Sequence, residues 1–200
     1  MNSAGIILNG TSDNILPKDD FIICADGGMR HALNIKVNCV IGDFDSYDVS
    51  SLPSNISIIK HKIEKTETDG ELALRYAIKC GYSDINIYAA LGDRIDHTLG
   101  NLALLAIANK LGANAKILTS TVTILYANNH LNIETKKGTI VSIIPFAGVA
   151  KITDSSGLKY PLENLCLSPF SSRGISNIAL DDHISINVVE GSVFLFLNHL

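Results

Sequence analysis

The stretch Asp84–Leu111, DINIYAALGDRIDHTLGNLALLAIANKL, indicates the fold class of this chain. Its short apolar beginning predicts a buried strand over 84–90, and the segment 96–111 that follows predicts a helix ending at Gly112. The helix is expected to bury an apolar stripe, made of Leu99, Leu102, Ala103 and Ala106. A buried strand followed by a helix is the repeating unit of a mostly parallel sheet.

The same alternation extends back to the N-terminus. Further buried strands are expected at Gly5–Leu8, Phe21–Ala25, Cys39–Ile41, Ile56–Ile59 and Ala115–Leu118. A second helix is expected over Asp69–Cys80, where Thr68 and Glu71 form a capping-box pattern. Leu72, Tyr76 and Cys80 would lie on one face of that helix.

Beyond residue 122 the helical periodicity ends and short strand candidates follow one another. They are Val122–Tyr126, Leu131–Glu134, Thr139–Pro145, Val149–Thr153, Ile184–Val189 and Val193–Leu197. Their spacing is typical of a β-sandwich or barrel, and Glu190-Gly191-Ser192 is expected to form a hairpin turn. We therefore predict an α/β domain with a mostly parallel sheet over residues 1–126. An all-β sandwich is expected over residues 127–200.

Composition excludes several classes of protein. Of 200 residues, 46% are hydrophobic and 18% charged, and the net charge is −4, with no basic run. Binding to nucleic acid or to an anionic membrane through bulk charge is therefore not expected. No stretch approaches the ~20 apolar residues of a membrane span. The apolar run Ile6-Ile7-Leu8 is too short for a signal peptide, so we expect a cytoplasmic protein.

The four cysteines form no CxxC pair, which excludes a zinc knuckle or a thioredoxin-like redox pair. Cys24, Cys39 and Cys80 lie in apolar segments and are expected to be buried thiols.

Acidic residues gather where the predicted strands end. Asp26 follows one strand, Asp43-Phe44-Asp45 follows the next, Asp69 opens a helix, and Asp93 and Asp96 follow another strand. The carboxyl ends of parallel strands meet at one edge, which is where ligands bind in such sheets. A cluster of carboxylates repels itself unless a cation occupies it, and Mg²⁺ is the natural counter-ion. These residues favour a Mg²⁺-dependent enzyme acting on a phosphorylated ligand, most simply a nucleotide.

Each of these features also has a purely structural interpretation. Asp43 and Asp45 could cap turns, and Gly27-Gly28 could simply form a tight turn. The neighbouring cations, Lys65 and Arg94, could be solvated loop charges. His97 and Asn101 begin a helix on one face, and His97 could be only a cap. The loops around Tyr160 and Ser176-Asn177 could bind a small ring or be ordinary surface loops.

Taken in order, the motifs resemble those of the thiamine pyrophosphokinase family. They are ADGG at 25–28, IGDFDS at 41–46, TDGELAL at 68–74, GDRIDH at 92–97 with Asn101, GLKYPL at 157–162 and GISN at 174–177. The resemblance implies an N-terminal α/β domain and a C-terminal β-sandwich. It also implies transfer of a pyrophosphoryl group from ATP to thiamine, giving thiamine diphosphate and AMP.

The resemblance assigns expected roles to individual residues. Asp43, Asp45 and Asp69 would hold Mg²⁺ and, with Asp96, carry catalysis; Asp69 or Asp96 would accept the proton of the thiamine hydroxyl. Nucleotide binding is expected from Asp26, Gly27, Gly28, Ser46, Lys65, Thr68, Arg94, His97 and Asn101. Thiamine binding is expected from Tyr160, Ser176 and Asn177. The family is homodimeric, and its thiamine pocket is shared between subunits.

The chain departs from the family pattern at three places. It has Lys65-Thr66 where an acid is frequent, Val37-Asn38 where Pro-Asp is usual, and Tyr160 where a Trp is common. Two other functions compete with the kinase: a metal-dependent nucleotide transferase or phosphatase, and a non-catalytic thiamine or nucleotide sensor. Thiamine-dependent release of AMP would separate the three.

Overall fold

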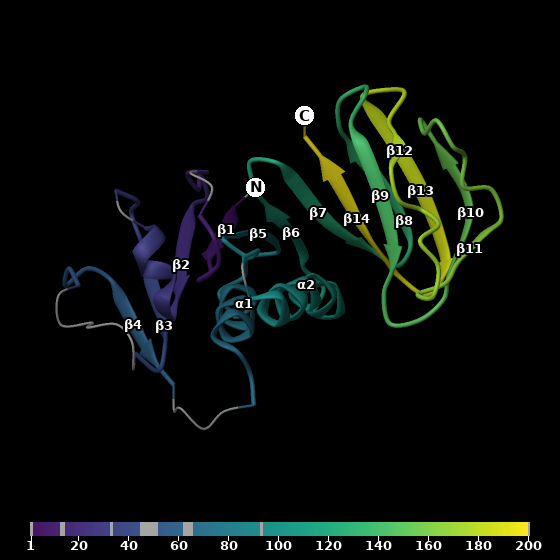
Figure 1. Ribbon diagram of the computed structural model, residues 1–200. Helices are drawn as coiled ribbons and strands as arrows, with labels where there is room; N and C mark the ends of the chain where they lie inside the picture. Colours follow the sequence, from purple (N-terminus) through teal and green to yellow (C-terminus); the bar gives the residue numbers. More distant parts are fainter. Residues whose placement is uncertain are drawn as a thin grey trace. The chain divides into compact units, whose positions relative to one another are not determined.

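The computed structural model describes residues 2–12, 15–32, 34–44, 52–61, 66–92 and 94–199. It is mostly sheet with few helices, as expected (Figure 1). The chain divides into two compact units, Met1–Ser120 and Thr121–Leu200, which we call unit 1 and unit 2. The boundary predicted after Tyr126 falls inside strand β7, Val122–Ala127, whereas the division lies just before that strand.

The described strands of unit 1 pair with one another in parallel, in the order β6-β5-β1-β2-β3-β4. Their bounds are β1 Ser3–Ile7, β2 Phe21–Ala25, β3 Cys39–Gly42, β4 Ser57–Lys60, β5 Asp84–Tyr88 and β6 Asn114–Leu118. Each overlaps a predicted strand. The chain leaves β1 toward β2 on one side and later returns to β1 through β5 on the other, so the order reverses at β1 and β5.

Two α-helices of unit 1 pack side by side, α1 over Asp69–Lys79 and α2 over Ile95–Lys110 (Figure 1). The predicted helix bounds agree to within a residue, but the predicted buried faces are wrong. In α1 the buried residues are Gly70, Ala73, Leu74 and Ala77. In α2 they are Leu104, Leu105 and Ala108, while Leu99 is 63% exposed. Cys80, expected inside, is exposed, whereas Cys24 and Cys39 are buried.

One face of the sheet in unit 1 is covered by irregular chain and by the 3₁₀ helix η1, Asp26–His31. Ile15 and Ile35 pack there against Cys24, Val40 and Tyr88. Asp19 ties the covering segment down, because its carboxylate accepts hydrogen bonds from Asn86 Nδ2 at 2.5 Å and Tyr88 Oη at 2.8 Å. Burial next to this carboxylate raises the pKa of the Tyr88 phenol well above its usual value.

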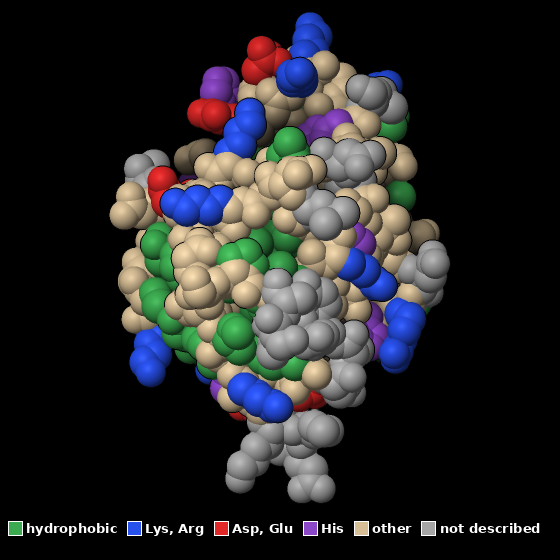
Figure 2. All heavy atoms as spheres, turned by 90° about the vertical axis from the view of Figure 1, so that its left-hand side faces the viewer, with side chains coloured by type: hydrophobic (Ala, Val, Ile, Leu, Met, Phe, Trp, Pro, Cys, Tyr) green, Lys and Arg blue, Asp and Glu red, His purple; other side chains and the backbone are tan. Residues whose placement is uncertain are grey.

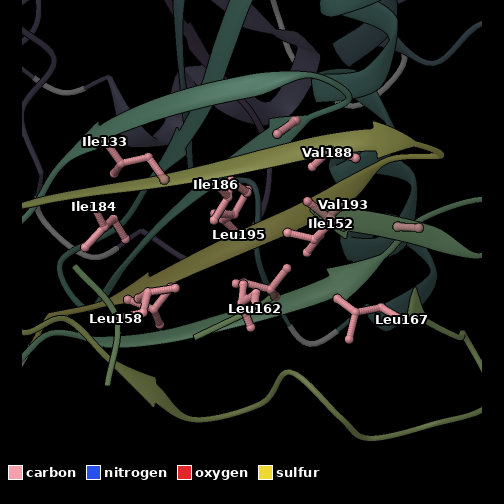
Figure 3. Close-up of a cluster of buried hydrophobic side chains, with 14 of the residues drawn as sticks. Ile133, Ile152, Leu158, Leu162, Leu167, Ile184, Ile186, Val188, Val193 and Leu195 are labelled. Carbon is pink, nitrogen blue, oxygen red and sulfur yellow. The ribbon is translucent and has the colours of Figure 1, made fainter. Parts of the chain in front are cut away.

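Unit 2 consists of antiparallel strands in two groups, β12-β9-β14-β7 and β11-β10-β13-β8. The bounds besides β7 are β8 His130–Glu134, β9 Ile140–Pro145, β10 Ala150–Ser156, β11 Leu165–Leu167, β12 Asn177–Ile178, β13 His183–Glu190 and β14 Val193–Asn198. Alternate side chains of both groups meet in one apolar core, where Ile152, Ile186 and Leu195 are almost completely buried (Figure 3). Their burial, at roughly 1.5–3 kcal/mol for each such side chain, stabilises this unit.

The expected hairpin at 190–192 is wrong. The turn does join β13 to β14, but these strands belong to different groups, so the chain crosses from one sheet to the other there. Gly191 has φ +74°, and a Cβ at this residue would lie 2.2 Å from the Val149 carbonyl oxygen. Glycine is therefore required at this crossing.

Two structural findings concern the expectations about membranes and nucleic acid that were drawn from composition. In the part of the chain that the structure describes, no helix has the length and apolarity needed to cross a membrane. On the face drawn in Figure 2, the Lys and Arg side chains are scattered among other side chains rather than gathered in one patch.

Candidate active site

A cleft of about 810 Å³ opens in unit 1 at the carboxyl ends of β1, β2 and β5. This edge is where the strand order reverses, and parallel sheets bind ligands at such a reversal. Predicted site residues that line it are Asp26, Thr68, Asp69, Arg94, Asp96, His97 and Asn101. They come from the end of β2 and from the N-terminal ends of α1 and α2.

The floor of the cleft is the segment 8–11, which continues β1 beside the end of β5. The amides of Leu8, Gly10 and Thr11 donate to the carbonyls of Tyr88, Ala89 and Leu91 at 2.9, 2.8 and 2.7 Å. A Cβ at Gly10 would lie 2.3 Å from the Leu91 carbonyl oxygen, so only glycine allows this approach.

Helix η1 packs on the other side of that segment. A Cβ at Gly28 would lie 2.2 Å from the Ile7 carbonyl oxygen, and one at Gly27 would lie 2.5 Å from Asn9 Nδ2. The two glycines predicted to bind nucleotide therefore let η1 approach the chain closely, and neither lines the cleft. One side chain of η1 completes the contact: Arg30 Nη2 donates a hydrogen bond to the Asn9 carbonyl at 2.8 Å.

Asp26 lies beside Gly42, the residue before Asp43, across the ends of β2 and β3. A Cβ at Gly42 would lie 2.9 Å from the Cβ of Asp26 and 3.2 Å from its buried Oδ1. Asp43 itself does not line the cleft. Asp26 has φ +40° and Phe44 has φ +59°, a left-handed conformation that is strained for residues other than glycine. Such strain is concentrated at functional sites.

The N-terminus of α1 faces the cleft. Thr68 is the predicted N-cap, since its hydroxyl accepts a hydrogen bond from the Glu71 amide at 3.2 Å. The carboxylate of Glu71, which a capping box would turn back toward Thr68, accepts hydrogen bonds from Arg75. Gly70 packs against Leu8 and Leu104, so the helix end lies close to the cleft floor. Free amides at a helix N-terminus favour an anion nearby.

The N-terminus of α2 carries an exposed ion pair. Arg94 binds Asp96 through Nη2 at 2.5 Å and Nε at 3.2 Å. This pairing holds the pKa of the Asp96 carboxyl at about 2, because the hydrogen bond and the positive charge both favour the ionised form. Two further α2 residues fasten the neighbouring loop: Asn101 Nδ2 donates to the Ala90 carbonyl at 2.7 Å, and Thr98 Oγ1 accepts from the Gly92 amide at 3.2 Å.

The carboxylates suit a hard cation, since oxygen ligands are what Mg²⁺ prefers. Asp26 and Asp69 line the cleft, and Asp43 follows the glycine that packs on Asp26. Within the described ranges, no three His, Cys, Asp or Glu side chains are grouped closely enough to hold a metal by themselves. Three predicted site residues, Asp45, Ser46 and Lys65, lie outside the described residues.

The three predicted thiamine-binding residues lie together in unit 2. The segments 157–160 and 177–180 run antiparallel, through a bridge between Leu158 and Ala179 and the bond from the Lys159 amide to the Ile178 carbonyl. The buried Asn177 accepts from the Tyr160 amide at 3.0 Å and donates to the Tyr160 carbonyl at 2.7 Å. Its amide group thus holds the backbone of Tyr160, a residue that is 56% exposed.

Ser176 is exposed and has φ +61°, and its amide donates to Ser142 Oγ at 3.1 Å. Tyr160 and Ser176 are the two side chains of this set that face solvent, and Asn177 connects their segments.

Sequence reasoning missed Arg30 and Asn9 in the cleft of unit 1. Arg30 lies outside every motif quoted for the family resemblance. Its only sequence signal is its place four residues after Asp26, in what proved to be one short helix.

Comparison with known proteins identifies both units. Residues 12–117 match the family model described as thiamin pyrophosphokinase, catalytic domain, and residues 128–193 match the model of its vitamin B1 binding domain. The chain is 28% identical over 137 residues to thiamine pyrophosphokinase of Bacillus subtilis, an alignment covering 68% of this chain and 64% of that enzyme.

Two further relatives agree with this result. Identity to thiamin pyrophosphokinase 1 of Caenorhabditis elegans is 23% over 182 residues, covering 84% of this chain and 74% of that one. The crystal structure of the Bacillus subtilis thiamine pyrophosphokinase superposes with a TM-score of 0.85 at 25% identity, over 98% of this chain and 99% of that one. With its cleft at the strand reversal and both family models matched, this chain belongs to the thiamin pyrophosphokinase family.

Proposed function

We propose that this chain transfers the pyrophosphoryl group of ATP to the hydroxyl of thiamine, releasing AMP and thiamine diphosphate. The observation that carries the proposal is the cleft of unit 1, where carboxylates and two helix N-termini meet at the strand reversal. Such chemistry needs alignment and charge neutralisation more than covalent help from the protein. We further infer that unit 1 is an α/β nucleotide domain and that unit 2 is a thiamine-binding β-sandwich.

Mg²⁺ and the phosphates would be held by Asp43, Asp45 and Asp69, with Asp26 as a further acidic neighbour. When bound there, the ion would neutralise charge on the phosphate oxygens. The helix N-termini at Asp69 and Asp96 direct backbone amides toward the same space and favour the anionic tail. Asn101 and Thr98 hold the 90–92 loop, which fixes the wall of the cleft before substrate enters.

Of the two candidate proton acceptors, Asp96 is the weaker. Its pKa of about 2 leaves the carboxylate with little affinity for a proton near neutral pH. Asp69 lines the cleft and is the acceptor that we propose. Replacing Asp96 by Asn is then expected to weaken nucleotide binding while leaving the acidic limb of the pH–rate profile in place.

Thiamine would stack on the exposed ring of Tyr160, with Ser176 beside it and Asn177 holding the Tyr160 backbone. A phenol offers a smaller stacking surface than the indole common in the family, so we expect a higher KM for thiamine. We also propose a homodimer in which the site is shared between subunits.

The test is a product assay with ATP, with and without thiamine and Mg²⁺. AMP that appears only when thiamine and Mg²⁺ are both present supports the proposal. ADP or phosphate as the product would indicate a phosphatase or another transferase. Thiamine or nucleotide binding without any turnover would indicate a sensor. Light scattering that gives a stable monomer at micromolar concentration would contradict the homodimer.

A further inference from the structure

The described wall of the cleft contains two guanidinium groups in very different settings. Arg94 is bound through two nitrogens to Asp96, at 2.5 and 3.2 Å. Both side chains are mostly exposed, with 71% and 65% of their surface accessible. The charge of Arg94 is therefore already matched by a carboxylate in the protein itself.

Arg30 lines the same cleft from η1. Its one hydrogen bond among the described residues runs from Nη2 to the Asn9 carbonyl at 2.8 Å, and no described carboxylate forms an ion pair with it. A guanidinium has five N–H donors, and a neutral carbonyl uses one of them without cancelling the charge. Arg30 is thus oriented by the protein and keeps its charge and further donors for a ligand.

The anchor of Arg30 is rigid on both sides. The Asn9 carbonyl belongs to the 8–11 segment, which is bonded to residues 88–91, and Gly27 and Gly28 of η1 pack directly on that segment. An arginine tied in this way loses less conformational entropy on binding than one on a mobile loop.

The charge of the cleft favours such a group for binding an anion. The described lining contains three carboxylates, those of Asp26, Asp69 and Asp96, against the two guanidinium groups. A polyphosphate that enters this space meets net negative charge. Arg94 can bind it only if its guanidinium group is shared between the phosphate and Asp96. Arg suits phosphate because its planar donors match two phosphate oxygens at once.

We propose that Arg30 is a phosphate-binding residue of this cleft: its anchored guanidinium contacts the polyphosphate tail of the nucleotide. This inference rests on the proposed function for the identity of the nucleotide but not for the binding of polyphosphate itself. Loss of Arg30 should then weaken binding of the polyphosphate tail but not of the nucleoside, because its charge recognises phosphate and no part of the base.

The experiment measures binding of two probes to the full chain by calorimetry, inorganic tripolyphosphate and adenosine, in Arg30→Gln, Arg30→Lys and the wild type. Arg30→Gln is expected to weaken the binding of tripolyphosphate about 10- to 100-fold, the range for loss of a charge-assisted hydrogen bond. Arg30→Lys should recover part of that loss, since it keeps the charge but not the planar donors. Adenosine should bind within twofold of wild type in both variants.

Arg75→Gln is the matched control, because Arg75 is a partly exposed arginine of the same unit whose partner, Glu71, lies outside the cleft. It should leave both probes unchanged. Arg30→Gln with wild-type affinity for tripolyphosphate would overturn the proposal. Equal losses for tripolyphosphate and adenosine would also overturn it, since they would show that Arg30 only supports the 8–11 segment.

The outcome is independent of the reaction. A wild-type protein that binds tripolyphosphate through Arg30 but forms no AMP from ATP and thiamine would refute the proposed function and leave the phosphate contact standing. If the wild-type protein forms AMP but Arg30→Gln binds tripolyphosphate with full affinity, the proposed function stands and the phosphate contact of Arg30 is refuted.

Discussion

The two units hold their candidate binding residues in different ways. The cleft of unit 1 is assembled from segments far apart in the sequence, after β1, after β2, at the start of α1 and around α2. In unit 2 the candidate thiamine residues Tyr160, Ser176 and Asn177 form a patch on two segments that pair directly. The buried side-chain amide of Asn177 is hydrogen-bonded to both the backbone amide and the backbone carbonyl of Tyr160. The cleft therefore depends on the whole parallel sheet, whereas the patch depends on a few local hydrogen bonds.

The largest effect is expected at the cleft from Asp69→Asn. The change removes a carboxylate that we place at the metal and the thiamine hydroxyl, and such groups contribute ~10²- to 10⁴-fold to turnover. We expect kcat to fall by that factor while the thermal midpoint changes little. Asp43→Asn is expected to act in the same way.

Asp84→Asn is the matched control, since Asp84 begins β5 at the amino edge of the same sheet. It should retain the wild-type kcat. If Asp69→Asn and Asp43→Asn also keep full activity and metal dependence, the catalytic assignment is wrong.

The next effect separates unit 2 from unit 1. Asn177→Ala leaves the partly buried backbone amide and carbonyl of Tyr160 without this side-chain partner, and a lost partner in a buried site costs about 1–3 kcal/mol. We expect the KM for thiamine to rise and the unfolding free energy to fall, with affinity for ATP unchanged. Enzyme kinetics with each substrate varied in turn measures the split.

Asn187→Ala serves as the comparison, because Asn187 binds Thr153 and Asp154 elsewhere in the same unit. It should lower stability without a specific effect on thiamine. Equal increases in both KM values for Asn177→Ala would show that the two units do not act separately.

A smaller effect is expected from the helix cap at the cleft. Thr68→Ala removes the hydroxyl that accepts a hydrogen bond from the Glu71 amide, and loss of an N-cap lowers the unfolding free energy by about 1 kcal/mol. Urea unfolding measures it, and Thr68→Ser should restore most of the stability. A Thr68→Ala variant as stable as the wild type would mean that solvent replaces the cap.

The smallest effect concerns the floor of the cleft and its pH dependence. Burial lowers the pKa of His31 below its usual value of 6.5, so the folded state disfavours the protonated ring relative to the unfolded state. As the pH falls below 6.5, the unfolded chain binds more protons at this residue than the folded one, and stability decreases. His31→Asn keeps a polar side chain at this residue but does not titrate.

Urea unfolding between pH 7.5 and 5 should therefore show a smaller loss of stability in His31→Asn than in the wild type. His183→Asn, at an exposed residue of unit 2, should follow the wild-type curve. Identical pH dependence in all three proteins would exclude His31 as a source of the loss.

The strands were predictable because each is a short apolar run between turn residues, a property local to the sequence. Of the strands that the structure describes, only the short β11 and β12 escaped prediction. The buried helix faces were not predictable in this way. In α1 the sheet is contacted by small residues such as Gly70, Ala73 and Ala77, which carry little apolar signal. In α2 apolar residues occur all round, so no single stripe stands out.

By itself, the sequence determined which segments become strands and helices, and which acidic motifs follow them, since both depend on residues close together in the chain. Tertiary structure alone decided that Arg30 reaches the cleft and that Asn177 holds Tyr160. These contacts depend on how strands are ordered and how closely backbones approach, and neither property belongs to any single stretch of the sequence.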